Sequence, residues 1–159
     1  MFDLIIKNGK VNTGAGNPWF KADIGISGDK IIKIGKIDEE AKEVLDADGM
    51  IVCPGFIDLH DHSDFTILVN READSKVHMG VSTTVYASCG SGAAPLNDEM
   101  REEVRRQSPY LAEAGVEVDW STMEEYLERV ESWGISINVD PLVGFGTVIK
   151  AQIGGGVGC

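Results

Sequence analysis

Two histidines separated by one residue, His60 and His62, directly follow the apolar run Phe56–Leu59, which we expect to be a β-strand. Residues at positions i and i+2 of an extended segment point to the same side, so both imidazoles can face one metal ion. Imidazole nitrogen is a common ligand of zinc. Because the pattern is short, a pair of histidines on a surface loop is the alternative interpretation.

Carboxyl and hydroxyl groups around the two histidines favour a functional site. Asp58 lies within the apolar run, where an unpaired carboxylate would be costly. Ser63 and Asp64 come just after the histidines and could orient the imidazoles through hydrogen bonds, as groups around a metal site commonly do.

Cys89 is the third candidate ligand, in a loop of small residues, Ala87–Gly92, that follows the β-rich run Val81–Tyr86. A thiolate needs a nearby positive charge or a metal ion to be stable. A single cysteine is more often an inert core residue. Its place at the end of the next strand after the histidine pair favours ligation, because a βα barrel keeps its chemistry at the carboxyl ends of its strands.

The remaining candidate motifs indicate no second site. The glycine-rich segments Gly144-Phe145-Gly146 and Gly154–Gly158 lack the spacing of phosphate-binding loops. His78, between Val77 and Met79 in a helical stretch, is most simply structural.

Residues 1–53 read as short strands of a small antiparallel β-structure. Asn8-Gly9 between two extended runs predicts a hairpin, and Gly28-Asp29 predicts another turn. After Pro54 the pattern changes to strand, helix, strand, which predicts the start of a βα-repeat architecture over 54–159. The expected fold class is therefore α/β.

Helix signals in the second part predict where its helices begin. A helix is expected near 70–79, and Asn97 can cap another. Ser108 before Pro109 marks a third start. Ser121 and Glu124 suggest a capping box for a fourth helix, whose spacing predicts a buried stripe of Met123, Tyr126, Leu127 and Val130. A third strand is expected over Ile135–Val139.

Composition excludes several classes of protein. The chain has 159 residues, 43% of them hydrophobic, and a formal charge of −12. Eleven acids and four arginines between Asn97 and Glu131 indicate solvated helix faces, and the acidic balance argues against a nucleic-acid surface. Three cysteines, Cys53, Cys89 and Cys159, match no disulfide framework, and no signal peptide or membrane span is evident. A cytoplasmic, non-membrane protein is expected.

The run Val52–His62 resembles the first barrel strand of the amidohydrolase superfamily, which typically reads Pro-Gly-Phe-Ile-Asp-x-His-x-His. The segments LIIKNGKV and DIGISGDKIIKIG resemble that superfamily's N-terminal β-sandwich portion. Gly80–Val85, followed by Ser88-Cys89-Gly90 and Ala94-Pro95-Leu96, is similar to the narrower N-acyl-D-amino-acid deacylase (D-aminoacylase) branch. Asn138-Val139 and Leu142-Val143-Gly144 also fit that branch.

The resemblance implies a β-sandwich portion over 1–53 and the opening of a (β/α)₈ TIM-type barrel over 54–159. It implies zinc as cofactor, with His60, His62 and Cys89 in the metal site, and hydrolysis of the amide bond of N-acyl-D-amino acids by a metal-activated water. It also implies a general-base aspartate and further histidine ligands, which we expect beyond Cys159. A complete barrel needs about 250 residues, whereas the chain ends 106 residues after Cys53, at residue 159.

The sequence departs from the family at Phe145 and Ile149, where relatives tend to carry His and Arg. A cyclic amidase of the dihydroorotase or hydantoinase kind shares the first-strand motif, but those enzymes use a lysine where this branch uses cysteine. A non-catalytic remnant that binds a metal or a partner is the other alternative. Three barrel strands alone would expose apolar edges, so self-association is expected.

Overall fold

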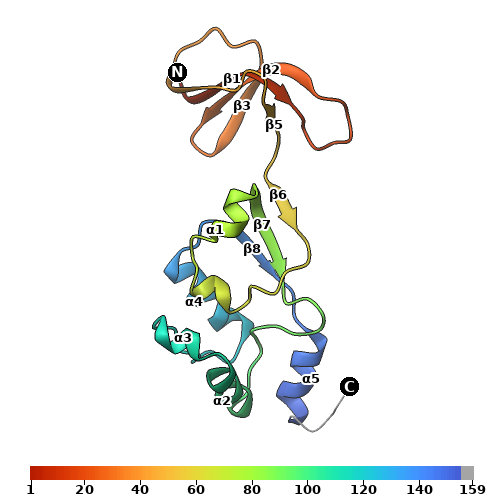
Figure 1. The fold of residues 1–159 in the computed structure, drawn as a ribbon, viewed down its shortest axis with the longest axis vertical. Coiled ribbons are helices and arrows are strands. Elements are labelled where there is room, and N and C mark those ends of the chain that lie inside the picture. Colours follow the sequence, from red (N-terminus) through yellow and green to blue (C-terminus); the bar gives the residue numbers. More distant parts are fainter. Residues whose placement is uncertain (155–159) are drawn as a thin grey trace. The chain divides into compact units, whose positions relative to one another are not determined.

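The computed structural model describes residues 1–154, and the glycine-rich end after Gly154, with Cys159, lies outside them. The chain divides into two compact units, Met1–Pro54 and Gly55–Cys159, which are described separately. The first unit is built from strands, and the second combines strands with helices (Figure 1). The fold is therefore mixed α/β, as the sequence predicts.

The described residues of the first unit form one five-stranded sheet. Its strands are β1 (Phe2–Val11), β2 (Phe20–Ser27), β3 (Lys30–Gly35), β4 (Ala41–Asp46) and β5 (Ile51–Val52). Their order is β3-β2-β1-β4, and β5 pairs with the end of β1. β2 and β3 form an antiparallel hairpin around Gly28-Asp29, where the turn is expected.

Two expectations for this unit are wrong. β1 continues without a turn through Asn8-Gly9, with a bulge between Ile6 and Gly9 in place of a hairpin. Asn8 has a left-handed φ of 62°, and a β-carbon at Gly9 would lie 2.6 Å from Val52 Cγ2, so the pair bends β1 and admits β5. In addition, β4 and β5 both run parallel to β1. The β2–β3 hairpin connects β1 to β4 in the chain. The sheet is therefore mixed, not antiparallel.

Asp23 on β2 is a buried carboxylate that ties three segments of this unit together. Its Oδ1 accepts a hydrogen bond from Asn8 N at 2.9 Å, and its Oδ2 accepts from Ile37 N and Lys7 Nζ, both at 3.1 Å. Burial alone would raise the pKa of Asp23, but these donors outweigh burial and lower that pKa below its ordinary value.

We expect Asp23→Asn to destabilise the first unit by about 2 kcal/mol, because an amide cannot replace the charge-assisted bonds to all three donors. The folded-state pKa lies below the unfolded value, so this stabilisation is present above about pH 4 and is lost as the pH falls through the folded pKa. Urea unfolding followed by circular dichroism should show the difference shrinking below about pH 4. Asp38→Asn, at an exposed ion pair with Lys36, is the control and should change stability little.

The described part of the second unit, residues 55–154, contains three parallel strands in sequential order: β6 (Phe56–Asp58), β7 (Val81–Tyr86) and β8 (Asn138–Pro141). The short helices η1 (Thr66–Leu68) and α1 (Asp74–His78) lie between β6 and β7 in the chain. Between β7 and β8 come α2 (Asp98–Gln107), α3 (Pro109–Glu113) and α4 (Met123–Trp133), and α5 (Phe145–Ile153) follows β8. Parallel strands in this order are typical of successive βα units.

Two elements of this unit begin later than the sequence predicts. α1 starts at Asp74 and not near Asn70, because Ala73 has a left-handed φ of 48° that interrupts helical backbone. β8 starts at Asn138 and not at Ile135. Ser136 N donates to Arg71 O, and pairing with β7 begins only where Asn138 meets Thr83.

The helix caps agree with the sequence except at α4. Asn97 caps α2 by accepting a hydrogen bond from Met100 N at 2.9 Å, and α3 begins at Pro109. The capping box of α4 is formed by Thr122 and Glu125, one residue later than expected. The stripe on α4 is only half buried: Tyr126 and Val130 are buried, whereas Met123 is partly exposed and Leu127 is exposed.

Aromatic side chains form the centre of the second unit's core. Trp120 lies against Phe65 and Tyr126, with ring centroids 6.3 and 5.5 Å apart, and its Nε1 donates to Ala93 O at 2.8 Å. Tyr126 meets the ring of Tyr86 edge-on at 6.2 Å. Phe65 belongs to the segment after β6 and Ala93 to the segment after β7, so this core fixes both loops that carry the candidate ligands.

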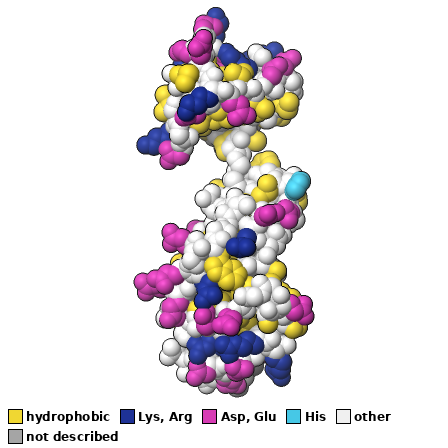
Figure 2. All heavy atoms as spheres, turned by 90° about the vertical axis from the view of Figure 1, so that its left-hand side faces the viewer, with side chains coloured by type: hydrophobic (Ala, Val, Ile, Leu, Met, Phe, Trp, Pro, Cys, Tyr) yellow, Lys and Arg dark blue, Asp and Glu magenta, His cyan; other side chains and the backbone are white. Residues whose placement is uncertain are grey.

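One face of the second unit carries interspersed acidic and basic side chains (Figure 2). Ion pairs account for part of this pattern, among them Arg129 with Asp119 at 2.7 Å and Arg105 with Glu102.

Apolar side chains on β6 are also exposed, with Phe56 and Ile57 at about 60%. Self-association through such an edge remains a prediction. None of the helices described between residues 1 and 154 has the length and apolar character needed to cross a membrane.

Candidate metal centre

His60 and His62 lie immediately beyond β6, at its carboxyl end. Asp58, the last residue of β6, shapes this segment because its Oδ1 accepts a hydrogen bond from His60 N at 3.2 Å. The two imidazole rings meet edge to face, with centroids 5.4 Å apart and planes at 66°. Both side chains are exposed, and a donor nitrogen of each ring lies within 4.8 Å of the other.

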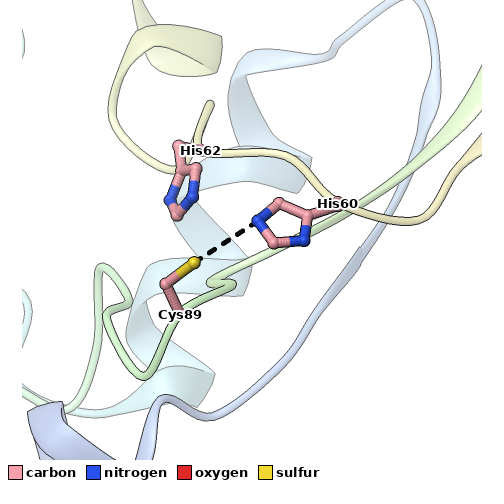
Figure 3. Close-up of side chains that lie close together, drawn as sticks. All are labelled: His60, His62 and Cys89. Atoms are coloured by element: carbon pink, nitrogen blue, oxygen red, sulfur yellow. Dashed lines mark hydrogen bonds between the residues drawn. The ribbon is translucent and has the colours of Figure 1, made fainter.

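Cys89 joins the histidines from the loop after β7, the cysteine loop (Ala87–Gly92). Its Sγ lies 3.4 Å from His60 Nε2, and Figure 3 shows the thiol facing both rings. One donor atom from each of the three residues lies within 4.8 Å of the others. β6 and β7 are adjacent and parallel, so the loops after them meet at one edge of the sheet. The structure thus brings together all three residues that the sequence proposes as ligands.

These distances fit a transition-metal ion. A tetrahedral zinc ion, with Zn–N near 2.0–2.1 Å and Zn–S near 2.3 Å, separates its donor atoms by about 3.3 to 3.6 Å. The pair Cys89 and His60 already has this separation, and His62 needs only a small movement. Two imidazoles and a thiol are donors that suit zinc better than magnesium or calcium. Within residues 1–154 this is the only cluster of three histidine, cysteine or acidic side chains with such spacing.

The backbone of the cysteine loop is strained. Cys89 has a φ of 57° and Ala87 a φ of 66°, in the left-handed region where a β-carbon costs about 1–2 kcal/mol. Such a conformation persists only where surrounding contacts impose it. Strain of this kind clusters at functional sites.

An ion network lies beside the histidine pair. Lys76 on α1 reaches Asp58 Oδ2 at 2.9 Å and Asp61 Oδ2 at 3.2 Å. Asp61 also accepts hydrogen bonds from Ser63 Oγ and Thr84 Oγ1, each at 2.9 Å. The bond from Lys76 lowers the pKa of Asp58. Burial would raise the pKa of Asp61, but its three side-chain donors outweigh burial and lower it. The network therefore holds charged carboxylates on both sides of His60.

We expect Lys76→Met to destabilise the second unit by about 2 kcal/mol, because it leaves two partly buried carboxylates without their cation. Both carboxyl pKa values are lowered in the folded state, so the loss should be full above about pH 4 and should fade as the pH drops through the folded values. Urea unfolding at several pH values measures it. Lys76→Arg keeps the charge and should recover most of the stability; equal losses in the two variants would contradict this account.

Ser63 and Asp64 have roles other than the one expected for them. Ser63 donates to Asp61, and no hydrogen bond joins Ser63 or Asp64 to an imidazole among the described residues. Asp64 is buried, which raises the pKa of its carboxyl group, and its backbone oxygen accepts from Tyr126 Oη at 2.6 Å. A phenol has one proton, so Tyr86 must donate to Tyr126 across their 2.9 Å contact. Burial raises the pKa of Tyr86 to about 12. These bonds anchor the histidine segment (residues 59–65) to the core.

The other sequence candidates lie elsewhere in the second unit. His78 is exposed, and its Nδ1 lies 2.7 Å from Asp74 O of the same helix. Phe145 and Ile149, the departures from the family pattern, are on α5, where Phe145 is 76% exposed. Lys76 was not singled out from the sequence. A lysine in the last turn of a short helix carries no special signal, although the costly carboxylate of Asp58 implies that some cation must pair with it.

No family model matches the chain. It is 32% identical over 152 residues to the D-aminoacylase of Alcaligenes xylosoxydans xylosoxydans, covering 94% of this chain and 30% of that protein. A D-aminoacylase structure, described for its binuclear metal centre, superposes with a TM-score of 0.83 at 31% identity, over 96% of this chain and 32% of that one.

A second solved relative is the N-acyl-D-glutamate deacylase from Bordetella bronchiseptica, complexed with zinc and a phosphonate inhibitor. It has a TM-score of 0.81 at 30% identity, and the match covers 96% of this chain and 31% of that one. An L-hydantoinase from Arthrobacter aurescens matches less well, with a TM-score of 0.50 at 28% identity, over 68% of this chain and 25% of that one. The cyclic-amidase alternative is therefore not favoured. The chain spans about 30% of the length of its D-aminoacylase relatives, and within that part it belongs to the D-aminoacylase branch of the amidohydrolases.

Proposed function

We propose that this chain supplies the metal-binding edge of a zinc-dependent hydrolase that cleaves the amide bond of N-acyl-D-amino acids. The observation that carries the proposal is the convergence of His60, His62 and Cys89 at the carboxyl ends of two adjacent parallel strands. Relatives that share this part of the fold are D-aminoacylases and an N-acyl-D-glutamate deacylase complexed with zinc, which supports both the reaction and the metal.

His60, His62 and Cys89 would hold the ion, with the thiol as thiolate. Three protein donors leave room at a four-coordinate ion for a further ligand or a substrate group. A bound zinc ion supplies a Lewis acid that polarises an amide carbonyl and makes water more acidic. The chain's own contribution is to orient the donors: Asp58 accepts from His60 N, and Lys76 keeps Asp58 and Asp61 in ion pairs.

The general-base aspartate and the remaining histidine ligands implied by the family are proposed to lie beyond Cys159. We therefore propose that the 159-residue chain alone has no detectable deacylase activity. The barrel assignment for residues 54–159 and the β-sandwich assignment for residues 1–53 are part of the same proposal.

The test begins with the intact mass of the protein from its native source, compared with 17.1 kDa for this chain. The native protein is then assayed with N-acetyl-D-amino acids, their L-enantiomers, and a hydantoin as cyclic amide. Zinc-dependent release of the free D-amino acid is the expected result. Hydrolysis of the hydantoin alone would favour the cyclic amidase. Zinc binding without turnover of any substrate by the native protein would favour a non-catalytic remnant.

A further inference from the structure

We propose that Thr147 on α5 is a positioning residue that holds the cysteine loop in the conformation that presents Cys89 to the metal. The inference rests on the proposed metal centre. Thr147 is 58 positions from Cys89 in sequence, and its side chain is buried, with 6% exposure. A buried threonine in the first turn of a helix needs a partner for its hydroxyl group, and here the partner belongs to the cysteine loop.

Two hydrogen bonds join Thr147 to this loop. Its backbone N donates to Gly90 O at 3.1 Å, and its Oγ1 accepts from Gly92 N at 2.9 Å. The two contacts fall one and three residues after Cys89, so they fix the chain just beyond the thiol. Within the loop itself, the backbone hydrogen bond from Ser91 N to Ser88 O is longer, at 3.2 Å.

The first turn of α5 lies directly against the cysteine loop, backbone to backbone. A β-carbon at Gly144 would be 2.6 Å from Gly90 O, and one at Gly146 would be 2.9 Å from the same atom. Glycine is required at both positions because the contacting atoms are backbone and cannot rotate away. This close approach is what places Thr147 within hydrogen-bond distance of Gly90 and Gly92.

The strained backbone of the cysteine loop explains why the hydrogen bonds to Thr147 are needed to restrain it. Cys89 and Ala87 both have positive φ values, which a residue with a β-carbon leaves when nothing restrains it. Without the Thr147 hydroxyl, Gly92 N loses its acceptor and the loop can relax. The thiol would then move away from His60 Nε2, now 3.4 Å distant.

The test compares Thr147→Val, which keeps the shape and removes the acceptor, with Thr147→Ser, which keeps the hydroxyl group. Co²⁺ is titrated into the full chain, and its thiolate charge-transfer absorption reports contact with a cysteine sulfur. Thr147→Val is expected to weaken Co²⁺ binding about 10-fold or more and to diminish this absorption, as loss of an outer hydrogen bond at a metal site commonly does. Thr147→Ser should stay near wild type.

Thr122→Val is the matched control, because Thr122 Oγ1 also accepts a backbone hydrogen bond, from Glu125 N at 3.2 Å, but at the start of α4. It should lower stability without changing the cobalt spectrum. Wild-type affinity and absorption in Thr147→Val, or an equal loss in Thr122→Val, would overturn the proposal.

Hydrogen exchange of the amides of Gly90–Gly92, measured without metal, separates this inference from the metal centre. The Gly92 amide should be protected in the wild-type chain and should exchange faster in Thr147→Val than in Thr147→Ser. If the wild-type chain binds no Co²⁺, the proposed metal centre fails, whereas the exchange result still decides whether Thr147 holds the loop. An unprotected Gly92 amide in the wild-type chain would overturn the role of Thr147 even if Thr147→Val does not fold.

Discussion

Cys89→Ser is expected to lower the affinity of the chain for Zn²⁺ by about 100-fold or more, because a serine hydroxyl stays protonated and is a poor zinc ligand, whereas a thiolate is a strong one. Without Cys89, only two ligands of the cluster remain, His60 and His62. Competition with a chromophoric chelator measures the affinity. The fold should change little, since Cys89 is exposed.

Cys53→Ser is the matched control for this substitution. Cys53 is also exposed, but it belongs to the first unit and, among residues 1–154, to no ligand cluster. The wild-type affinity should fall as the pH falls, because protons compete with the metal for imidazole and thiolate. Equal affinities in Cys89→Ser and Cys53→Ser would show that the thiol is not a ligand, and zinc binding that also survives His60→Ala would remove the metal centre altogether.

The three candidate ligands could be identified from the sequence because their positions follow from local rules. The i, i+2 spacing of His60 and His62 sets their direction, and the end of β7 sets the position of Cys89. Adjacent parallel strands then bring both loops to one edge. The helix starts at Asn97 and Pro109 are equally local, since each depends on residues within one turn.

The errors arose where distant parts of the chain decide the conformation. Asn8-Gly9 favours a turn locally, yet Asp23 and Val52 approach it from other strands and keep β1 continuous. The start of β8 depends on where Asn138 meets β7, which no local pattern contains. The capping box shifted by a single residue because Ser121 and Thr122 are both acceptable caps, and only Thr122 Oγ1 accepts the bond from Glu125 N.

The residues that hold the ligands in place cannot be predicted from the sequence, for the same reason. Lys76 pairs with carboxylates 18 and 15 positions away, and Thr147 contacts Gly92 across 55 positions. Neither residue type is unusual for its helix. Only the packing of α1 and α5 against the two ligand-bearing loops gives them a role.

Trp120→Ala is expected to destabilise the second unit by about 3–5 kcal/mol, the range for deleting a large buried aromatic side chain. Trp120 is 2% exposed, and its indole lies between Phe65 of the histidine segment and Ala93 beyond the cysteine loop. The substitution would leave a cavity and an unpaired carbonyl group at Ala93. Urea unfolding followed by far-ultraviolet circular dichroism measures the loss.

Trp133→Ala is the control for this loss, because Trp133 is only partly buried and lies at the surface against Arg71 and Arg129. Its truncation should cost about 1–2 kcal/mol, since less area returns to water. The same core anchors both ligand loops, so Trp120→Ala should also weaken metal binding more than Trp133→Ala does. A loss below about 1 kcal/mol for Trp120→Ala, or equal metal affinities in the two variants, would mean that the ligand loops are held without the aromatic core.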